Sequence, residues 1–169
     1  ILSPENTMLG PARLADLAEE IDAVREAGKH VVAHGRVSLT KDYLLMTAAD
    51  DILMSPSGRL YSFGLRFDQY FGSDALERLG VLPQFIHIGE FKTAAHRFIK
   101  STSTEPQQLM MEALYEGMSE TYRDRVSGRR NLEPEEAEVL FSDAPLDARS
   151  ARRAGLVDGA SFFSTLGDW

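Results

Sequence analysis

Apolar residues recur at three- and four-residue steps in several stretches of the chain, with charged residues between them. This spacing places the apolar side chains along one side of an α-helix. The first such stretch predicts a helix over residues 11–28. Its expected apolar face is formed by Leu14, Leu17, Ile21 and Val24. Similar patterns predict helices over residues 40–49, 68–80, 105–125, 134–140 and 148–154.

Three short apolar runs are typical of buried strands. Val31-Val32-Ala33 lies in the first, over residues 29–37. The second and third are predicted over residues 51–55 and 85–88. Residues expected to end the first two strands are Gly35, Pro56 and Gly58. Because these strands alternate with helices, the pattern predicts an α/β fold with a mostly parallel sheet and right-handed crossovers.

The length and composition restrict the class of protein. The chain has 169 residues with no internal repeat or linker, so we expect a single domain over residues 1–169. A formal net charge of −8 argues against a nucleic-acid binder, which needs basic surface, and against direct binding to an anionic membrane. Because cysteine is absent, disulfides, thiolate catalysis and cysteine-based zinc sites are excluded.

The sequence also contains no run of 18 apolar residues that would span a bilayer, and no signal peptide is visible. It opens with Ile1-Leu2-Ser3-Pro4 rather than an initiator methionine. We therefore expect a processed or truncated piece of a longer protein.

Common catalytic and cofactor motifs are missing from the sequence. There is no dinucleotide-binding Gly-x-Gly-x-x-Gly, no phosphate-binding loop and no Gly-x-Ser-x-Gly nucleophile elbow. The histidines form no helical metal-binding pair, so we expect them to be structural. These histidines are His30, His34, His87 and His96.

Lys92 is the strongest candidate for chemistry. It follows Gly89, just beyond the predicted strand over residues 85–88. A lysine held in an apolar cleft loses charge more easily, because desolvation lowers a lysine's pKa. It can then act as the base for a serine nucleophile where no histidine is available. The alternative is an exposed lysine that only adds charge to a turn.

The stretch around Lys92 resembles the lysine motif of the signal peptide peptidase A (protease IV) family. Residues 88–94 read Ile-Gly-Glu-Phe-Lys-Thr-Ala, with Phe98 following, where the family has Gly-x-Tyr/Phe-Lys-Ser/Thr-Ala. Other stretches resemble family segments in the same order and with similar spacing. They are residues 28–33, 43–52, 56–58 and 154–158.

The chain departs from the family at the nucleophile. The family serine, in an Ala-Ser-Gly-Gly-Tyr setting, falls on Thr40, which precedes Lys92 by 52 residues. Lys41 and Asp42 replace the glycines that follow that serine. Those glycines allow close backbone approach and leave amides free for an oxyanion. We therefore expect Thr40 and Ser38 to act as helix N-caps rather than nucleophiles.

A further departure is Ser-Phe-Gly-Leu over residues 62–65 in place of the family's Gly-Ser-Ile-Gly. A retained lysine with a lost serine setting resembles the N-terminal half of the long, tandem family members. In those members the second half supplies the serine. The resemblance thus implies that a homologous half normally follows this chain.

The resemblance implies a crotonase/ClpP-like α/β fold, with a mostly parallel sheet flanked by helices, and a Ser-Lys serine endopeptidase that degrades cleaved signal peptides. Lys92 would be the general base, with its amine in a groove close to the helix that starts at Thr40. The expected partners are peptide substrates, the serine-bearing half and further copies in a homo-oligomer. No cofactor, metal or nucleic acid is expected.

The expected location is the bacterial cell envelope, with an inner-membrane anchor outside this chain. Two other functions stay open: a catalytically silent scaffold half, and a crotonase-type acyl-CoA enzyme.

Overall fold

The computed structural model describes residues 1–61, 64, 67–86, 88–137 and 145–168. The chain divides into two compact units, one formed by residues 1–64 and 120–169 and the other by residues 65–119. The long helix α5 (Glu105–Arg130) contributes to both. The prediction of a single domain followed by a homologous half stays a prediction.

The first unit contains a mixed, mostly parallel sheet. Strand β1 (Val32–Leu39) pairs in parallel with β2 (Asp51–Tyr61), which also pairs in parallel with β4 (Gly159–Ala160). The short strand β3 (Leu146–Asp147) pairs antiparallel with β2. On the outer edge of β1, Leu2 forms a parallel bridge with Ala33. The predicted α/β fold with a mostly parallel sheet is therefore confirmed.

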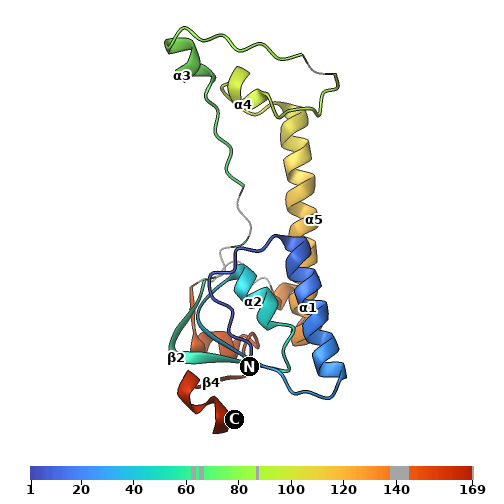
Figure 1. Cartoon of the computed structure of the whole chain (residues 1–169), viewed down its shortest axis with the longest axis vertical. Coiled ribbons are helices and arrows are strands. Elements are labelled where there is room, and N and C mark those ends of the chain that lie inside the picture. The colour runs from blue at the N-terminus through green and yellow to red at the C-terminus, as the bar shows by residue number, and fades with distance from the viewer. Residues whose placement is uncertain (62–63, 65–66, 87, 138–144, 169) are drawn as a thin grey trace. The chain divides into compact units, whose positions relative to one another are not determined.

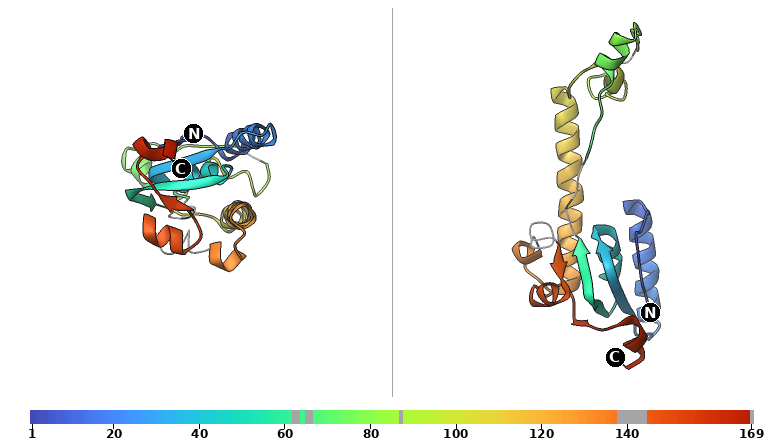
Figure 2. Two further views of the ribbon diagram at one scale, coloured as in Figure 1. Left: turned by 90° about the horizontal axis from the view of Figure 1, so that it is seen from below. Right: turned by 90° about the vertical axis from the view of Figure 1, so that its left-hand side faces the viewer.

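Helices cover both faces of this sheet, as Figure 2 shows, with α1 (Pro11–Glu26) on one side and α8 (Ala148–Arg153) on the other. Helix α2 (Thr40–Met46) connects β1 to β2. The described C-terminal part of the chain also contains α6 (Pro134–Ala137) and the 3₁₀ helix η1 (Phe163–Asp168). These helices agree with those predicted near residues 11–28, 40–49 and 148–154; of the helix predicted over 134–140, residues 138–140 lie outside the described residues.

The buried face of α1 agrees with the predicted one at Leu14 and Ile21 and differs from it at Leu17 and Val24. Leu14, Ala18 and Ile21 pack against α2 in a buried cluster. Leu17 and Val24, which were predicted on the apolar face, are 38% and 47% exposed. Both patterns have helical spacing, but the small Ala18 allows α2 to approach closely, so the face through Ala18 is the buried one.

Neither Gly35 nor Pro56 ends a strand, contrary to the prediction. The β1–β2 register moves from Gly35↔Met54 to Val37↔Arg59, so residues 55–58 lie opposite Arg36 alone. Such a bulge tolerates a proline, because the missing N–H is not needed for the ladder.

Gly58 lies in the same bulge and also fails to end its strand. A Cβ at this position would lie 2.8 Å from both the Arg36 and the Ser55 carbonyl oxygens. Only glycine fits here, because backbone atoms cannot move aside as a side chain can. Gly58 therefore allows β2 to continue through the bulge.

The second unit, residues 65–119, contains little regular structure. Its helices are α3 (Ser73–Arg78), α4 (His96–Ile99) and the first part of α5, drawn in green to yellow in Figure 1. The helix predicted over 68–80 is shorter than expected. The strand predicted over 85–88 is wrong: residues 85, 86 and 88 are not in a strand, and His87 lies outside the described residues. Their apolar pattern suits a strand, but a strand forms only when its backbone pairs with another.

No helix in the described ranges is both long enough and apolar enough to cross a membrane.

Asp50 connects the loop before β1 to the start of β2. Its carboxylate accepts hydrogen bonds from the Val31 N–H (2.8 Å) and the Arg25 Nε–H (2.7 Å). The Val31 N–H lowers the pKa of Asp50; burial acts in the opposite direction, and Arg25 adds to the lowering. Asp50 therefore stabilises the fold in its ionised form.

Asp50→Asn should lower the free energy of unfolding at pH 7 by about 1 kcal/mol, a value reduced for solvent screening. Because the folded-state pKa is lowered, this contribution is present above the unfolded-state value of about 3.9 and is lost as the pH falls through the folded-state value. Urea unfolding at neutral and acidic pH measures both effects. Asp16→Asn, an exposed change on α1, is the control. Equal losses in the two variants at pH 7 would contradict the assignment.

Candidate active site

Lys92 lies in a turn between Gly89 and α4. Gly89 has φ +99°, a conformation that favours glycine, and its carbonyl accepts the Lys92 N–H at 3.3 Å. The Lys92 side chain is exposed. Its own unit therefore does not enclose Lys92, and the apolar cleft expected around this lysine stays a prediction.

Two buried side chains that follow Lys92 in the chain hold the turn to its own unit. Thr93 and His96 are 6% and 7% exposed, and the Thr93 carbonyl accepts the His96 N–H at 2.9 Å. The His96 Nδ1 lies 3.3 Å from the Thr104 hydroxyl. The turn is thus anchored next to Lys92, while Lys92 itself remains available to another surface.

Thr40 and Ser38 do not cap α2, so the predicted N-cap role is wrong for both. Thr40 is the first residue of α2, and the N-cap residue is Leu39. Ser38 lies in β1 with its side chain buried, and its hydroxyl donates to the Met46 sulfur at 3.5 Å. A Cβ on Gly35 would lie 2.3 Å from the Ser38 Oγ, so Gly35 makes room for this inward orientation.

Asp42, rather than the hydroxyl of Thr40 or Ser38, accepts backbone N–H hydrogen bonds at the start of α2. Its fully buried carboxylate accepts N–H hydrogen bonds from Leu39 (3.0 Å), Thr7 (2.8 Å) and Asn6 (3.2 Å). An acidic residue at the third position of a helix commonly accepts the N-cap N–H. The position of Asp42, two residues after Thr40, was a sequence signal for this role, although its bonds to Asn6 and Thr7 could not be foreseen.

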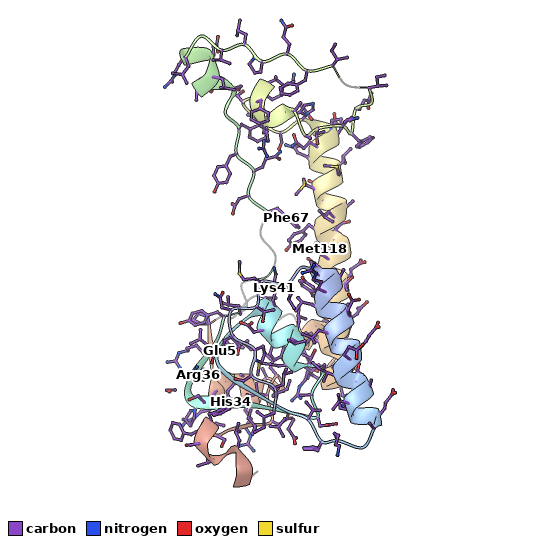
Figure 3. The ribbon with its side chains drawn as sticks, in the orientation of Figure 1. Glu5, His34, Arg36, Lys41, Phe67 and Met118 are labelled. Carbon is purple, nitrogen blue, oxygen red and sulfur yellow. The ribbon has the colours of Figure 1, made fainter. Side chains whose placement is uncertain are left out.

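A pocket of about 500 Å³ adjoins this end of β1, lined by Glu5, Asn6, Arg36, Val37 and Leu39. The Arg36 guanidinium donates two hydrogen bonds to the Glu5 carboxylate, at 2.7 and 2.9 Å (Figure 3). Since each charge is already paired, the pocket offers mainly the side chains of Val37 and Leu39 to a ligand.

The described histidines have structural partners. His30 and His34 are four residues apart, but His30 precedes β1 and contacts Asp51 at 2.7 Å. His34 is buried in β1, with its Nε2 3.0 Å from the Ser161 carbonyl oxygen. Among the described residues, no group of three or more histidine or acidic side chains is arranged to hold a metal ion.

Lys92 and Thr40 belong to different units, so the expected proximity of the Lys92 amine to the start of α2 stays a prediction.

Comparisons with known proteins identify relatives of this chain. It is 22% identical over 148 residues to the chloroplastic serine protease SPPA of Arabidopsis thaliana, covering 88% of this chain and 22% of the relative. It is 26% identical over 112 residues to Protease 4 of Haemophilus influenzae, covering 66% of this chain and 18% of the relative. The chain thus spans about a fifth of the length of these relatives.

Solved structures of similar arrangement are described as enoyl-CoA hydratases. One, from Magnetospirillum magneticum and described as an enoyl-CoA hydratase/carnithine racemase, has a TM-score of 0.44 and 16% identity, covering 93% of this chain and 42% of the other. An enoyl-CoA hydratase/isomerase from Cupriavidus metallidurans has a TM-score of 0.42 and 22% identity, with 94% and 44% covered. We draw no conclusion about activity from these likenesses.

The family is established by a match over most of the chain. Residues 23–168 match the sequence model of Peptidase family S49, and the two named relatives agree with the resemblance to signal peptide peptidase A. The chain therefore belongs to Peptidase family S49, as a member of the signal peptide peptidase A type.

Proposed function

We propose that this chain supplies the lysine of a Ser-Lys endopeptidase whose serine lies on a second, homologous half. Lys92 takes the proton from the serine hydroxyl as the hydroxyl attacks the scissile carbonyl carbon. It then returns that proton to the leaving amine when the peptide bond breaks. The proposed substrates are small membrane-released peptides such as cleaved signal peptides. The proposed location is the bacterial inner membrane, with the anchor outside this chain.

The observation that supports this division of roles most directly is the set of hydrogen bonds to Asp42. An acyl-transfer site needs free N–H donors for the oxyanion of its tetrahedral intermediate. At the start of α2, the Asp42 carboxylate already accepts the N–H groups of Leu39, Asn6 and Thr7. A second negative charge at this point would be repelled, so this end of β1 is unsuited to hold a nucleophile.

The exposure of Lys92 fits the same proposal. A general base acts best where bulk water is excluded, and an exposed side chain lacks that exclusion. Another surface must cover Lys92 to desolvate it, and the serine-bearing half would provide that surface together with the nucleophile.

A fluorophosphonate probe applied to the full-length protein tests this proposal, because it reacts with an activated serine. The expected labelled residue is a serine outside residues 1–169, and Lys92→Ala should abolish its labelling. Labelling of Ser38 or Thr40 would overturn the assignment. Failure to label any residue would favour the silent scaffold.

The isolated 169-residue chain should show no peptidase activity on a fluorogenic peptide or on casein. Ser38→Ala and Thr40→Ala should leave that background unchanged, because neither hydroxyl is expected to be a nucleophile. Turnover by the purified wild-type chain that disappears in Thr40→Ala would show that this half carries its own nucleophile.

A further inference from the structure

The interior of the second unit is polar. Among its described residues, the only buried side chains are those of Thr93, His96 and Gln107, and none of its apolar side chains is buried. Burial of a polar side chain costs free energy that burial of an apolar one would not. Hydrogen bonds are directional, however, so polar contacts can fix the orientation of two segments more strictly than apolar packing can. The polar interior therefore favours a precise local arrangement over maximum stability.

Hydrogen-bonding contacts lead from the start of α5 to both neighbours of Lys92. The Thr104 hydroxyl, directly before α5, lies 3.3 Å from the His96 Nδ1. The His96 N–H donates to the Thr93 carbonyl at 2.9 Å, and the Thr93 N–H donates to the Phe91 carbonyl at 3.0 Å. The residues immediately before and after Lys92 are thus connected to α5 through His96.

The other contacts of α4 lead to segments without regular structure. The Arg97 carbonyl accepts the Gly72 N–H at 2.8 Å, and the Phe98 ring stacks on Phe85 with 5.9 Å between the ring centroids. Neither Gly72 nor Phe85 lies in a helix or strand. By contrast, the His96 imidazole contacts the residue that precedes α5, a regular helix of 26 residues. This contact is therefore the one best suited to hold the Lys92 turn in a fixed place.

We propose that His96 is a positioning residue for Lys92, which it holds in place through its contact with the Thr104 hydroxyl. A lysine carries its amine on a flexible four-carbon stem, so the amine is well placed only if the backbone beneath it is fixed. A general base must reach its proton within hydrogen-bonding distance, and a displacement of about 1 Å can cost on the order of 100-fold in rate. The inference rests on the proposed function, in which Lys92 is the base.

His96→Phe and His96→Asn in the full-length enzyme test this role. Phenylalanine fills the space of the imidazole but cannot contact the Thr104 hydroxyl, so kcat should fall by about 10- to 100-fold. KM should stay within about threefold, because the lost interaction serves the transition state rather than substrate binding. Asparagine is smaller, but its amide can contact the Thr104 hydroxyl, so His96→Asn should keep more of the wild-type kcat than His96→Phe. A packing role alone would give the opposite order, because asparagine leaves a cavity.

Thr104→Val removes the hydroxyl at the other end of the contact while keeping the shape of the side chain. It should lower kcat in the same way, and Thr104→Ser, which retains a hydroxyl, should not. The double variant His96→Phe/Thr104→Val should lose less than the product of the two single losses, because each single change already breaks the contact. Thr102→Val, at an exposed threonine two residues earlier, is the matched control and should keep the wild-type kcat. Circular dichroism and thermal unfolding check that the variants are folded.

Lys92→Ala, measured in parallel, separates failure of this inference from failure of the proposed function. If Lys92→Ala is inactive but His96→Phe keeps the wild-type kcat, or exceeds His96→Asn, the positioning role is wrong and the role of Lys92 stands. If Lys92→Ala keeps its activity, the proposed base is wrong and the positioning role with it. If His96→Phe does not fold, the two Thr104 variants decide: a loss of kcat in Thr104→Val alone supports the proposal, and equal kcat values in Thr104→Val and Thr104→Ser overturn it.

Discussion

Lys92→Arg should lower kcat/KM by about 100- to 10,000-fold in the full-length enzyme, while the protein remains folded. General-base catalysis contributes a factor of this size, and arginine stays protonated at any working pH. The substitution keeps most of the side-chain length, so under the proposed role of Lys92 it removes mainly the ability to accept a proton. Lys92 is exposed in a turn, so the free energy of unfolding should change by less than about 0.5 kcal/mol.

Lys100→Arg is the matched control, since Lys100 is an exposed lysine in the same unit. It should leave kcat/KM within about twofold of the wild type, as expected for an exposed change away from the site. Lys92→His can retain a trace of activity if the imidazole reaches the serine. Near-normal kcat/KM in Lys92→Arg would show that Lys92 is an ordinary surface charge and that another group is the base.

The parts of the fold that the sequence predicted are those decided by local spacing. Residues 11–28 and 148–154 have a helical pattern, and α1 and α8 form close to those limits. Spacing did not identify the buried side of α1, because the alternatives through Leu17 and Ala18 have the same period. Only the contact with α2 favours the side containing Ala18.

Errors occur where a distant partner decides the structure. Strand β2 continues beyond Pro56 because the bulge opposite Arg36 accommodates the residues that would otherwise end it. Residues 85, 86 and 88 stay irregular because their described surroundings offer no pairing edge. The local sequence does not show whether a pairing partner is present. For that reason the strand predicted over residues 85–88 and the strand end predicted at Pro56 are both wrong.

In the candidate site, too, the features set by a short local motif could be predicted, and those set by distant residues could not. The Lys92 turn was recognisable from a short motif, and Gly89 adopts the positive φ that such a turn requires. The role of Asp42 depends on Asn6 and Thr7, which are far away in the sequence. Motif spacing could show that the glycines after the nucleophile position were lost, but it could not show what replaced them.

Arg130 and Asp158 join the end of α5 to the sheet in the first unit. The Arg130 guanidinium donates to both Asp158 carboxylate oxygens, at 3.0 and 2.7 Å, and to the Gly155 carbonyl at 3.0 Å. Asp158 also accepts the Ile52 N–H of β2 at 2.7 Å. Burial alone would raise the pKa of Asp158, but the hydrogen bonds from Arg130 and Ile52 outweigh it and lower the pKa.

Arg130→Met should lower the free energy of unfolding at pH 7 by about 2–4 kcal/mol. The Arg130 side chain is only 10% exposed, and its removal leaves the Asp158 charge without its ionic partner. The value lies towards the lower end of the range for buried pairs, because the Asp158 side chain is 32% exposed. Arg152→Met, an exposed arginine of α8, is the control and should change stability by less than about 0.5 kcal/mol.

The pH dependence separates loss of the ion pair from loss of packing. A lowered folded-state pKa means that Asp158 stabilises the fold above the unfolded-state value of about 3.9, and that this contribution disappears as the pH falls through the folded-state value. The difference between wild type and Asp158→Asn should therefore be largest near pH 7 and should shrink in acid. In the double variant Arg130→Met/Asp158→Asn, the loss should be smaller than the sum of the two single losses, because each single change already breaks the pair. Strictly additive losses, or a loss in Arg130→Met no larger than in Arg152→Met, would show that the pair does not hold α5 to the sheet.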